Sequence, residues 1–157
     1  MNVGGLQEVG HLAGNHFAVS FVAVAIAIAV SVPIGLWLGH LGRAEFLAVG
    51  VANIGRAVPP LAIIAFFVAF LGTGFTNVAF ALTLLAIPPI LTNTYVGMRQ
   101  VDRELIDAAR GQGLSDVQIV RQVELPLALA TIFGGVRISA VTVLATAIIA
   151  PSAGLDT

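Results

Sequence analysis

Between Ala57 and Met98 the sequence carries no acidic or basic side chain. At about 42 residues, this stretch is roughly twice the length of about 20 residues that one helix needs to cross a bilayer. Gly72 and Gly74 lie within it, and glycine permits the tight reversal that two successive crossings require. We therefore expect two membrane-spanning helices here, one ending and the next beginning near this glycine turn.

The composition of the whole chain favours lipid over water as its main solvent. Of the 157 residues, 58% are hydrophobic and 10% are charged, whereas soluble domains contain about 25% charged residues. The net charge of −1 provides no basic surface for nucleic acid. Cysteine is absent and every basic residue other than histidine is an arginine. The chain therefore lacks cysteine chemistry and the lysine of a nucleotide-binding P-loop.

Four apolar runs approach or exceed the length of about 20 residues that a membrane crossing requires. We expect the crossings at about residues 17–38, 47–71, 75–95 and 127–150. A polar segment at about residues 99–126 separates the third run from the fourth. The expected fold class is an all-α, polytopic transmembrane bundle, which forms a single domain over residues 1–157.

The positions of the arginines predict how the bundle is oriented. Arg43 follows the first crossing, and the polar segment contains Arg99, Arg103, Arg110 and Arg121. The N-terminal tail, the glycine turn and the C-terminal tail contain no arginine. Because basic residues concentrate in cytoplasmic loops, we expect the polar segment in the cytoplasm and the N-terminus outside.

The polar segment has the pattern of two short helices separated by a glycine. Asp102 is a suitable N-cap for the first helix, and Gly113 suits its C-terminal end. Ser115 and Gln118 match a capping box at the start of the second short helix, and Pro126 marks the entry to the next crossing. Such a pair could lie on the bilayer surface or insert into a groove of a cytoplasmic partner. The acidic residues slightly outnumber the basic ones, which favours the partner.

The spacing within this segment resembles the EAA loop of ATP-binding-cassette (ABC) importer permeases. In that family Glu-Ala-Ala is followed after three residues by Gly, and after nine more by Ile-x-Leu-Pro. Here Asp107-Ala108-Ala109, Gly113 and Val123-Glu124-Leu125-Pro126 keep every spacing, with Asp in place of Glu and Val in place of Ile. Residues 91–97 and 134–137 resemble permeases for glycine betaine, carnitine and choline, and the likeness covers roughly residues 11–150.

The resemblance implies a type I importer fold and a set of partners. Two permease domains, identical or paired, would surround a pathway, and an extracellular or periplasmic binding protein would deliver the solute. Each EAA loop would dock on a separate ABC ATPase subunit through Glu104, Asp107, Ala108, Ala109, Gly113, Leu114, Val123, Leu125 and Pro126. Permeases of the family carry at least one more crossing, so the chain is expected to be short at its C-terminus. There are two alternatives. One is a methionine- or sulfonate-type permease, and the other is a truncated or structural membrane protein without transport activity.

Two proline pairs and two polar residues are candidates for a translocation path: Pro59, Pro60, Pro88, Pro89, Asn93 and Arg137. The prolines would bend helices that either pack together or border the path. Arg137 is an ionisable group inside the fourth apolar run, so it either faces the path or reaches the interface as a structural residue. The histidines lack the spacing of a helical metal pair, and we expect no metal, cofactor or enzymatic centre.

Overall fold

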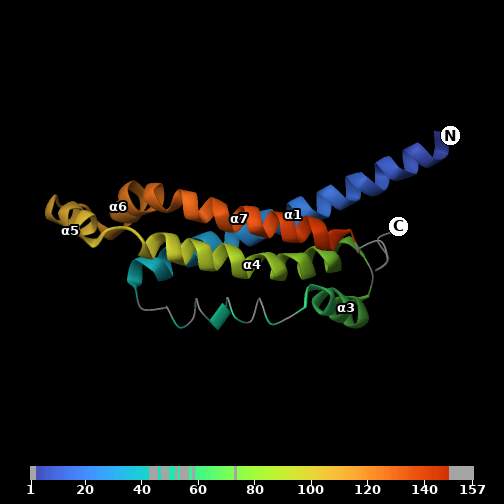
Figure 1. Ribbon diagram of the computed structural model, residues 1–157, viewed down its shortest axis with the longest axis horizontal. Helices are drawn as coiled ribbons and strands as arrows, with labels where there is room; N and C mark the ends of the chain where they lie inside the picture. The colour runs from blue at the N-terminus through green and yellow to red at the C-terminus, as the bar shows by residue number, and fades with distance from the viewer. Residues whose placement is uncertain are drawn as a thin grey trace.

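The computed structural model describes residues 3–42, 46, 50–51, 53, 57, 59–72 and 74–148. Within these residues the elements are all helical, which confirms the predicted fold class (Figure 1). They are α1 (Val3–Leu41), α3 (Pro60–Leu71), α4 (Phe75–Arg99), α5 (Arg103–Gly111), α6 (Asp116–Ile119), a π-helical segment η1 (Val120–Glu124) and α7 (Leu125–Ala147).

Three long helices, α1, α4 and α7, lie side by side and form the body of the molecule (Figure 1). α4 contacts both of the others along their length, and α1 also contacts α7. The shorter α3 packs against α4, where the rings of Phe67 and Phe80 meet edge to face with centroids 5.4 Å apart. α5 and α6 lie at the end of the body away from the N-terminus.

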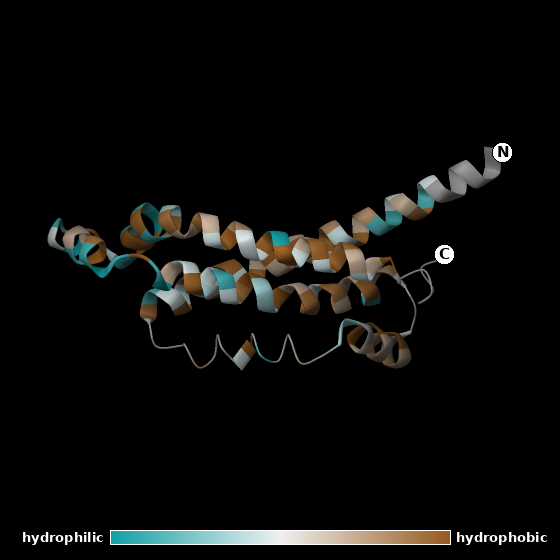
Figure 2. Ribbon diagram, in the orientation of Figure 1, coloured by the Kyte–Doolittle hydropathy of each residue, from teal (hydrophilic) through white to brown (hydrophobic). Residues whose placement is uncertain are grey.

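Among the described residues, three helices are long and apolar enough to cross a membrane: Gly10–Leu41, Phe75–Arg99 and Asp116–Ala147. They overlap the crossings expected at 17–38, 75–95 and 127–150. Most residues of the three-helix body are apolar, and hydrophilic residues are concentrated around α5 (Figure 2). The crossing expected at 47–71 lies partly outside the described residues. Its described helix, α3, has 12 residues and spans about 18 Å, less than a hydrocarbon core of about 30 Å.

Small residues allow α1 and α4 to approach closely. A Cβ atom placed on Gly35 would lie 2.7 Å from Cβ of Thr94, and Gly39 packs at least as tightly against Met98. In membranes, helices associate mainly through such close van der Waals contact, because lipid provides little hydrophobic driving force between them. The spacing of four residues between these glycines therefore gives α1 a smooth face toward α4.

α4 continues through Pro88 and Pro89, although neither residue has a backbone N–H to donate. Side chains from the neighbouring helices bond to carbonyl groups beside this pair. Ser139 Oγ on α7 donates to the Ala86 carbonyl at 2.9 Å, and Ser31 Oγ on α1 donates to the Ile87 carbonyl at 3.4 Å. The proline pair therefore sits where all three long helices meet.

The second short helix expected in the polar segment is not separate, and this prediction was wrong. α6, η1 and α7 run on as one long helix from Asp116 to Ala147. Within η1 the hydrogen bonds widen, and the N–H of Leu125 donates to the carbonyl of Val120, five residues earlier. Such π-type widening and a proline within the first helical turn are both tolerated. The chain therefore passes Pro126 without breaking the helix.

Candidate functional site

The functional candidate is the elbow, which we define as α5, α6 and the turn between them (residues 103–119). Asp102 caps α5, since its carboxylate accepts a hydrogen bond of 2.9 Å from the N–H of Glu104. At Gly113 the chain turns with φ of +86°, a conformation that favours glycine. The N–H of Ser115 then donates to Gln118 Oε1 at 2.8 Å. These local bonds confirm the predicted caps and the glycine break between the two helices.

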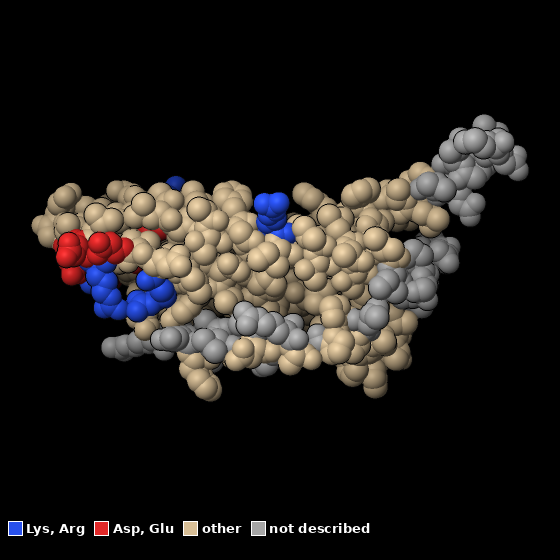
Figure 3. Space-filling view, in the orientation of Figure 1, with Lys and Arg blue, Asp and Glu red and all other residues tan. Residues whose placement is uncertain are grey.

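The predicted docking residues fall into two groups. Those on the elbow's surface are exposed, and acidic and basic side chains gather at this end of the molecule (Figure 3). The others form its base, where Ala109 is buried and Leu125 packs against the cluster around Met98 and Ala128. The residues exposed on the elbow are Glu104, Asp107, Ala108 and Gly113, and Pro126 is exposed beyond it, at the start of α7. The half-buried residues are Leu114, Val123 and Leu125.

A buried histidine–glutamate pair, which the sequence analysis did not single out, joins α1 to η1. His40 Nδ1 lies 2.7 Å from Glu124 Oε2, and the two side chains are 7% and 3% exposed. The other ring nitrogen of His40 lies 3.6 Å from Asp116 Oδ1, which in turn lies 3.5 Å from Nη2 of Arg110. A chain of polar contacts therefore runs from α5 through α6 to the end of α1 and back to η1.

The pair was missed because its residues are 84 positions apart and Glu124 belongs to a run rich in charges. One signal in the sequence could have revealed it. Glu124 lies four residues before Ala128, which is 1% exposed, so both share the helix face that turns toward the bundle. An acid on that face needs a buried partner.

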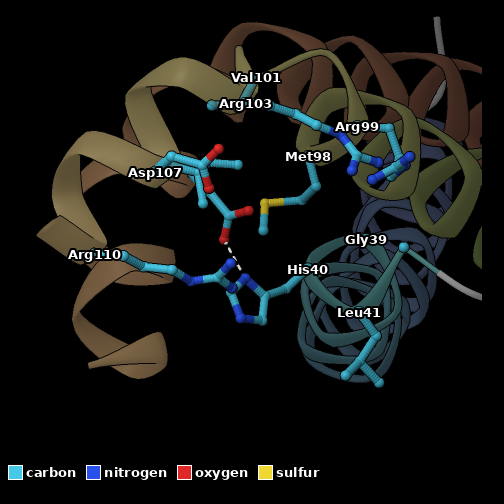
Figure 4. A pocket seen from close by; sticks show the side chains of 12 residues that line it. Gly39, His40, Leu41, Met98, Arg99, Val101, Arg103, Asp107 and Arg110 are labelled. Carbon is cyan, nitrogen blue, oxygen red and sulfur yellow. Dashed lines mark hydrogen bonds and ion pairs between the residues drawn. The ribbon is translucent and has the colours of Figure 1, made fainter. Parts of the chain in front are cut away.

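A cavity of about 380 Å³ opens beside this pair, between the elbow and the ends of α1 and α4 (Figure 4). Three arginines contribute to its wall, Arg99, Arg103 and Arg110, together with Asp107 and Glu124. Figure 4 shows Arg110 reaching from α5 toward His40, with a dashed line for the histidine–glutamate contact. Asp107, the acid of the motif, thus lines the cavity as well as the surface of the elbow.

The candidates for a translocation path are not gathered at one place. Asn93 donates from Nδ2 to the carbonyl of Pro89 at 2.8 Å, within its own helix. Pro59 and Pro60 are exposed at the start of α3, and Pro88 and Pro89 are half-buried inside α4.

Arg137 is exposed on α7 and makes no hydrogen bond or ion pair to the other residues that the structure describes. The position of Arg137 along the bundle follows from its neighbours on the same helix. Gly135 packs against Asn93, and Ser139 bonds to Ala86, so Arg137 is level with the middle of α4. A basic side chain is also visible midway along the body in Figure 3.

Residues 31–156 match the family described as binding-protein-dependent transport system inner membrane component. The chain belongs to this family. The resemblance to importer permeases, predicted from the loop spacing, is thereby confirmed. With three described helices that are long and apolar enough to span a bilayer, this inner membrane component is a multi-pass membrane protein.

Several relatives of this chain are named for the solutes that they transport. It is 40% identical to the carnitine transport permease protein OpuCB of Listeria monocytogenes over 94% of this chain and 70% of the relative. It is 37% identical to the choline transport system permease protein OpuBB of Bacillus subtilis, over 88% and 64%. It is 35% identical to the glycine betaine/carnitine/choline transport system permease protein OpuCB of Bacillus subtilis, over 94% and 68%. The chain thus spans about two thirds of the length of these relatives.

The fold is shared with a solved ABC transporter. A chain of the MetNI methionine ABC transporter, in inward-facing conformations, matches with a TM-score of 0.81 at 22% identity. The match covers 99% of this chain and 78% of the other. At this identity the likeness concerns the fold alone and carries no information about the solute.

Proposed function

We propose that this chain is the membrane-spanning permease subunit of an ABC importer for a small quaternary-amine osmoprotectant, such as glycine betaine, carnitine or choline. The observation that carries the proposal is the elbow, a capped helical knob at one end of an apolar bundle, with the spaced EAA-type motif on it. The solute class is supported by the relatives named for carnitine, choline and glycine betaine at 35–40% identity.

In this proposal the elbow docks in a groove of a separate ATP-binding subunit in the cytoplasm. The exposed side chains of Glu104, Asp107 and Ala108 are available for that contact. Leu125 is half-buried and packs against the bundle, and Val123 is also half-buried. ATP is hydrolysed on the partner, since this chain contains no lysine for a P-loop.

The same proposal covers the arrangement in the membrane. Residues 1–157 form one permease domain with crossings at about 17–38, 47–71, 75–95 and 127–150, and the N-terminus lies outside. A second permease copy, identical or paired, completes the pathway, and an extracellular or periplasmic binding protein delivers the solute.

The exposed face of α7 borders the proposed path. An arginine at the centre of a bilayer costs at least about 2.5 kcal/mol if it faces lipid. Arg137 is exposed level with the middle of α4, so we propose that its face is turned toward water or protein. Asn93 and the proline pairs at 59–60 and 88–89 are the other proposed path residues.

Docking can be tested with two matched glycine substitutions. Gly113 and Gly72 both have positive φ, +86° and +81°, and a Cβ on either meets no atom within 4 Å. They lie at opposite ends of the bundle. We expect Gly113→Arg to abolish co-purification with the ATP-binding subunit of an osmoprotectant importer, and Gly72→Arg to preserve it. If Gly113→Arg co-purifies with the ATP-binding subunit as well as Gly72→Arg does, docking at the elbow is contradicted.

The solute class requires a separate measurement. Vesicles containing the assembled importer and its binding protein are expected to accumulate labelled glycine betaine, carnitine or choline in an ATP-dependent manner. An excess of unlabelled quaternary amine should suppress this uptake, and an excess of methionine should not. ATP-dependent uptake of methionine without uptake of any quaternary amine would overturn the assignment.

A further inference from the structure

The His40–Glu124 pair has no place in the proposed docking surface or in the proposed path. Both side chains are almost fully buried, and their nitrogen and oxygen atoms are 2.7 Å apart. Buried pairs of polar or charged groups are weak sources of stability, because removing the groups from water offsets much of their attraction. An apolar pair of similar volume would hold the two helices together about as well. The polar pair therefore suggests a role other than stability.

The position of the pair links the elbow to a helix that is distant in sequence. His40 is in the last turn of α1, and Glu124 is the last residue of η1, directly before α7. The elbow also contacts His40, because Asp116 Oδ1 at the start of α6 lies 3.6 Å from Nε2 of the same imidazole ring. One histidine side chain thus contacts the beginning of α6 and the end of η1.

The segment that carries Glu124 is the part of the long helix with irregular hydrogen bonding. The hydrogen bonds of a π-helical segment span five residues instead of four, and such segments are frequently found at functional sites. This segment, η1, joins α6, the second helix of the elbow, to α7. His40 joins that segment to α1 by a polar contact whose geometry is directional. A contact between apolar side chains would not have this directionality.

We propose that His40 and Glu124 are positioning residues. When the ATP-binding subunit displaces the elbow, their contact makes α1 move together with the elbow. The pair thereby couples ATP hydrolysis to movement of the bundle. This inference rests on the proposed function, because it needs a partner that acts on the elbow. Docking itself uses other residues, so the assembled complex should form without the pair.

The test is the ratio of solute imported to ATP hydrolysed, in the full importer reconstituted in vesicles. We expect His40→Ala and Glu124→Ala to lower this ratio about tenfold, in the usual range of coupling between sites. Both variants should still co-purify with the ATP-binding subunit and hydrolyse ATP. His40→Gln, whose amide can still donate to the carboxylate, should retain most of the ratio. His16→Ala is the control, since His16 lies in the N-terminal half of the same helix, far from Glu124.

A structural role gives a different pattern. If the alanine variants lose assembly, or lose ATP hydrolysis and import in equal proportion, the pair only stabilises the fold and the inference is wrong. The inference is also wrong if His40→Gln is as deficient as His40→Ala. An unchanged ratio in all variants would overturn it too. Failure of the proposed function is distinguishable, because then the parent complex itself neither assembles nor imports.

A covalent bridge provides a second, independent measurement. The chain contains no cysteine, so His40→Cys and Glu124→Cys introduce the only two thiols. Before cross-linking, this double variant should show the low ratio of import to ATP hydrolysis of the alanine variants, because it also lacks the pair. Because α1 and η1 are proposed to move as one unit, joining the two thiols with a short reducible cross-linker should raise that ratio. A ratio that cross-linking leaves unchanged or lowers further would mean that joining α1 to η1 does not couple them to ATP hydrolysis, and would overturn the inference.

Discussion

Gly135 of α7 lies so close to Asn93 of α4 that a Cβ on residue 135 would be 2.7 Å from the Asn93 Cβ and 2.8 Å from the carbonyl oxygen of Pro89. The neighbouring Gly134 has no such contact within 4 Å. Two adjacent glycines in one helix therefore have different roles. Of these two glycines, Gly135 is the one that faces α4.

This difference predicts how the replacement of each glycine by alanine, which adds one methyl group, changes the stability of the protein. Gly135→Ala should destabilise the detergent-solubilised protein by about 1–3 kcal/mol, because the packed helices must move apart. Gly134→Ala should be neutral or stabilising by about 0.5–1 kcal/mol, because alanine is the better helix former. Thermal unfolding followed by size-exclusion chromatography measures both. Equal stability of the two variants would show that α4 and α7 do not pack as described.

The exposed arginine of α7 provides a prediction about transport. Arg137→Gln should reduce solute uptake about tenfold or more, since a guanidinium facing the proposed path can donate to the passing solute or its water a charge-assisted hydrogen bond of about 1.5–3 kcal/mol. The variant should be inserted and assembled with the ATP-binding subunit as well as the parent. Ile138→Ala, at the next exposed position of the same helix, is the control. Uptake that is unchanged in Arg137→Gln would exclude Arg137 from the path.

The orientation of the bundle predicts a labelling pattern. The chain has no cysteine of its own, so single cysteines can be placed at the exposed positions Ala108, on the elbow, and Thr76, at the start of α4. A membrane-impermeant maleimide added to intact cells should label Thr76→Cys and leave Ala108→Cys unlabelled until the membrane is opened. The opposite pattern would contradict both the orientation and docking to a cytoplasmic ATPase.

Interactions between near neighbours were predictable from the sequence. Asp102 caps α5 through the N–H of Glu104, two residues away, and Ser115 bonds to Gln118, three residues away. Such caps depend on local backbone geometry, which adjacent residue types determine. For the same reason, Gly113 was recognisable as the break after α5. The apolar runs likewise indicated helices, because their length and composition match the bilayer.

The continuity of α6 with α7 was not predictable in this way. Pro126 suggested a boundary, because proline lacks the N–H that continues a helix. In the structure η1 widens to five-residue hydrogen bonds just before it, while Leu125 packs against the bundle and Glu124 bonds to His40. A π-helical segment is costly by itself, so it depends on contacts from other helices.

The sequence by itself determined that this chain is a bundle of membrane helices with a polar knob of the importer-permease type. Those features depend on hydrophobicity, charge and residue spacing along one stretch of chain. Only the tertiary structure decided that His40 meets Glu124, because their contact requires the end of α1 to pack beside η1. It likewise decided that Gly135, and not Gly134, faces Asn93, since a helix turns about 100° per residue and only packing selects the contact face.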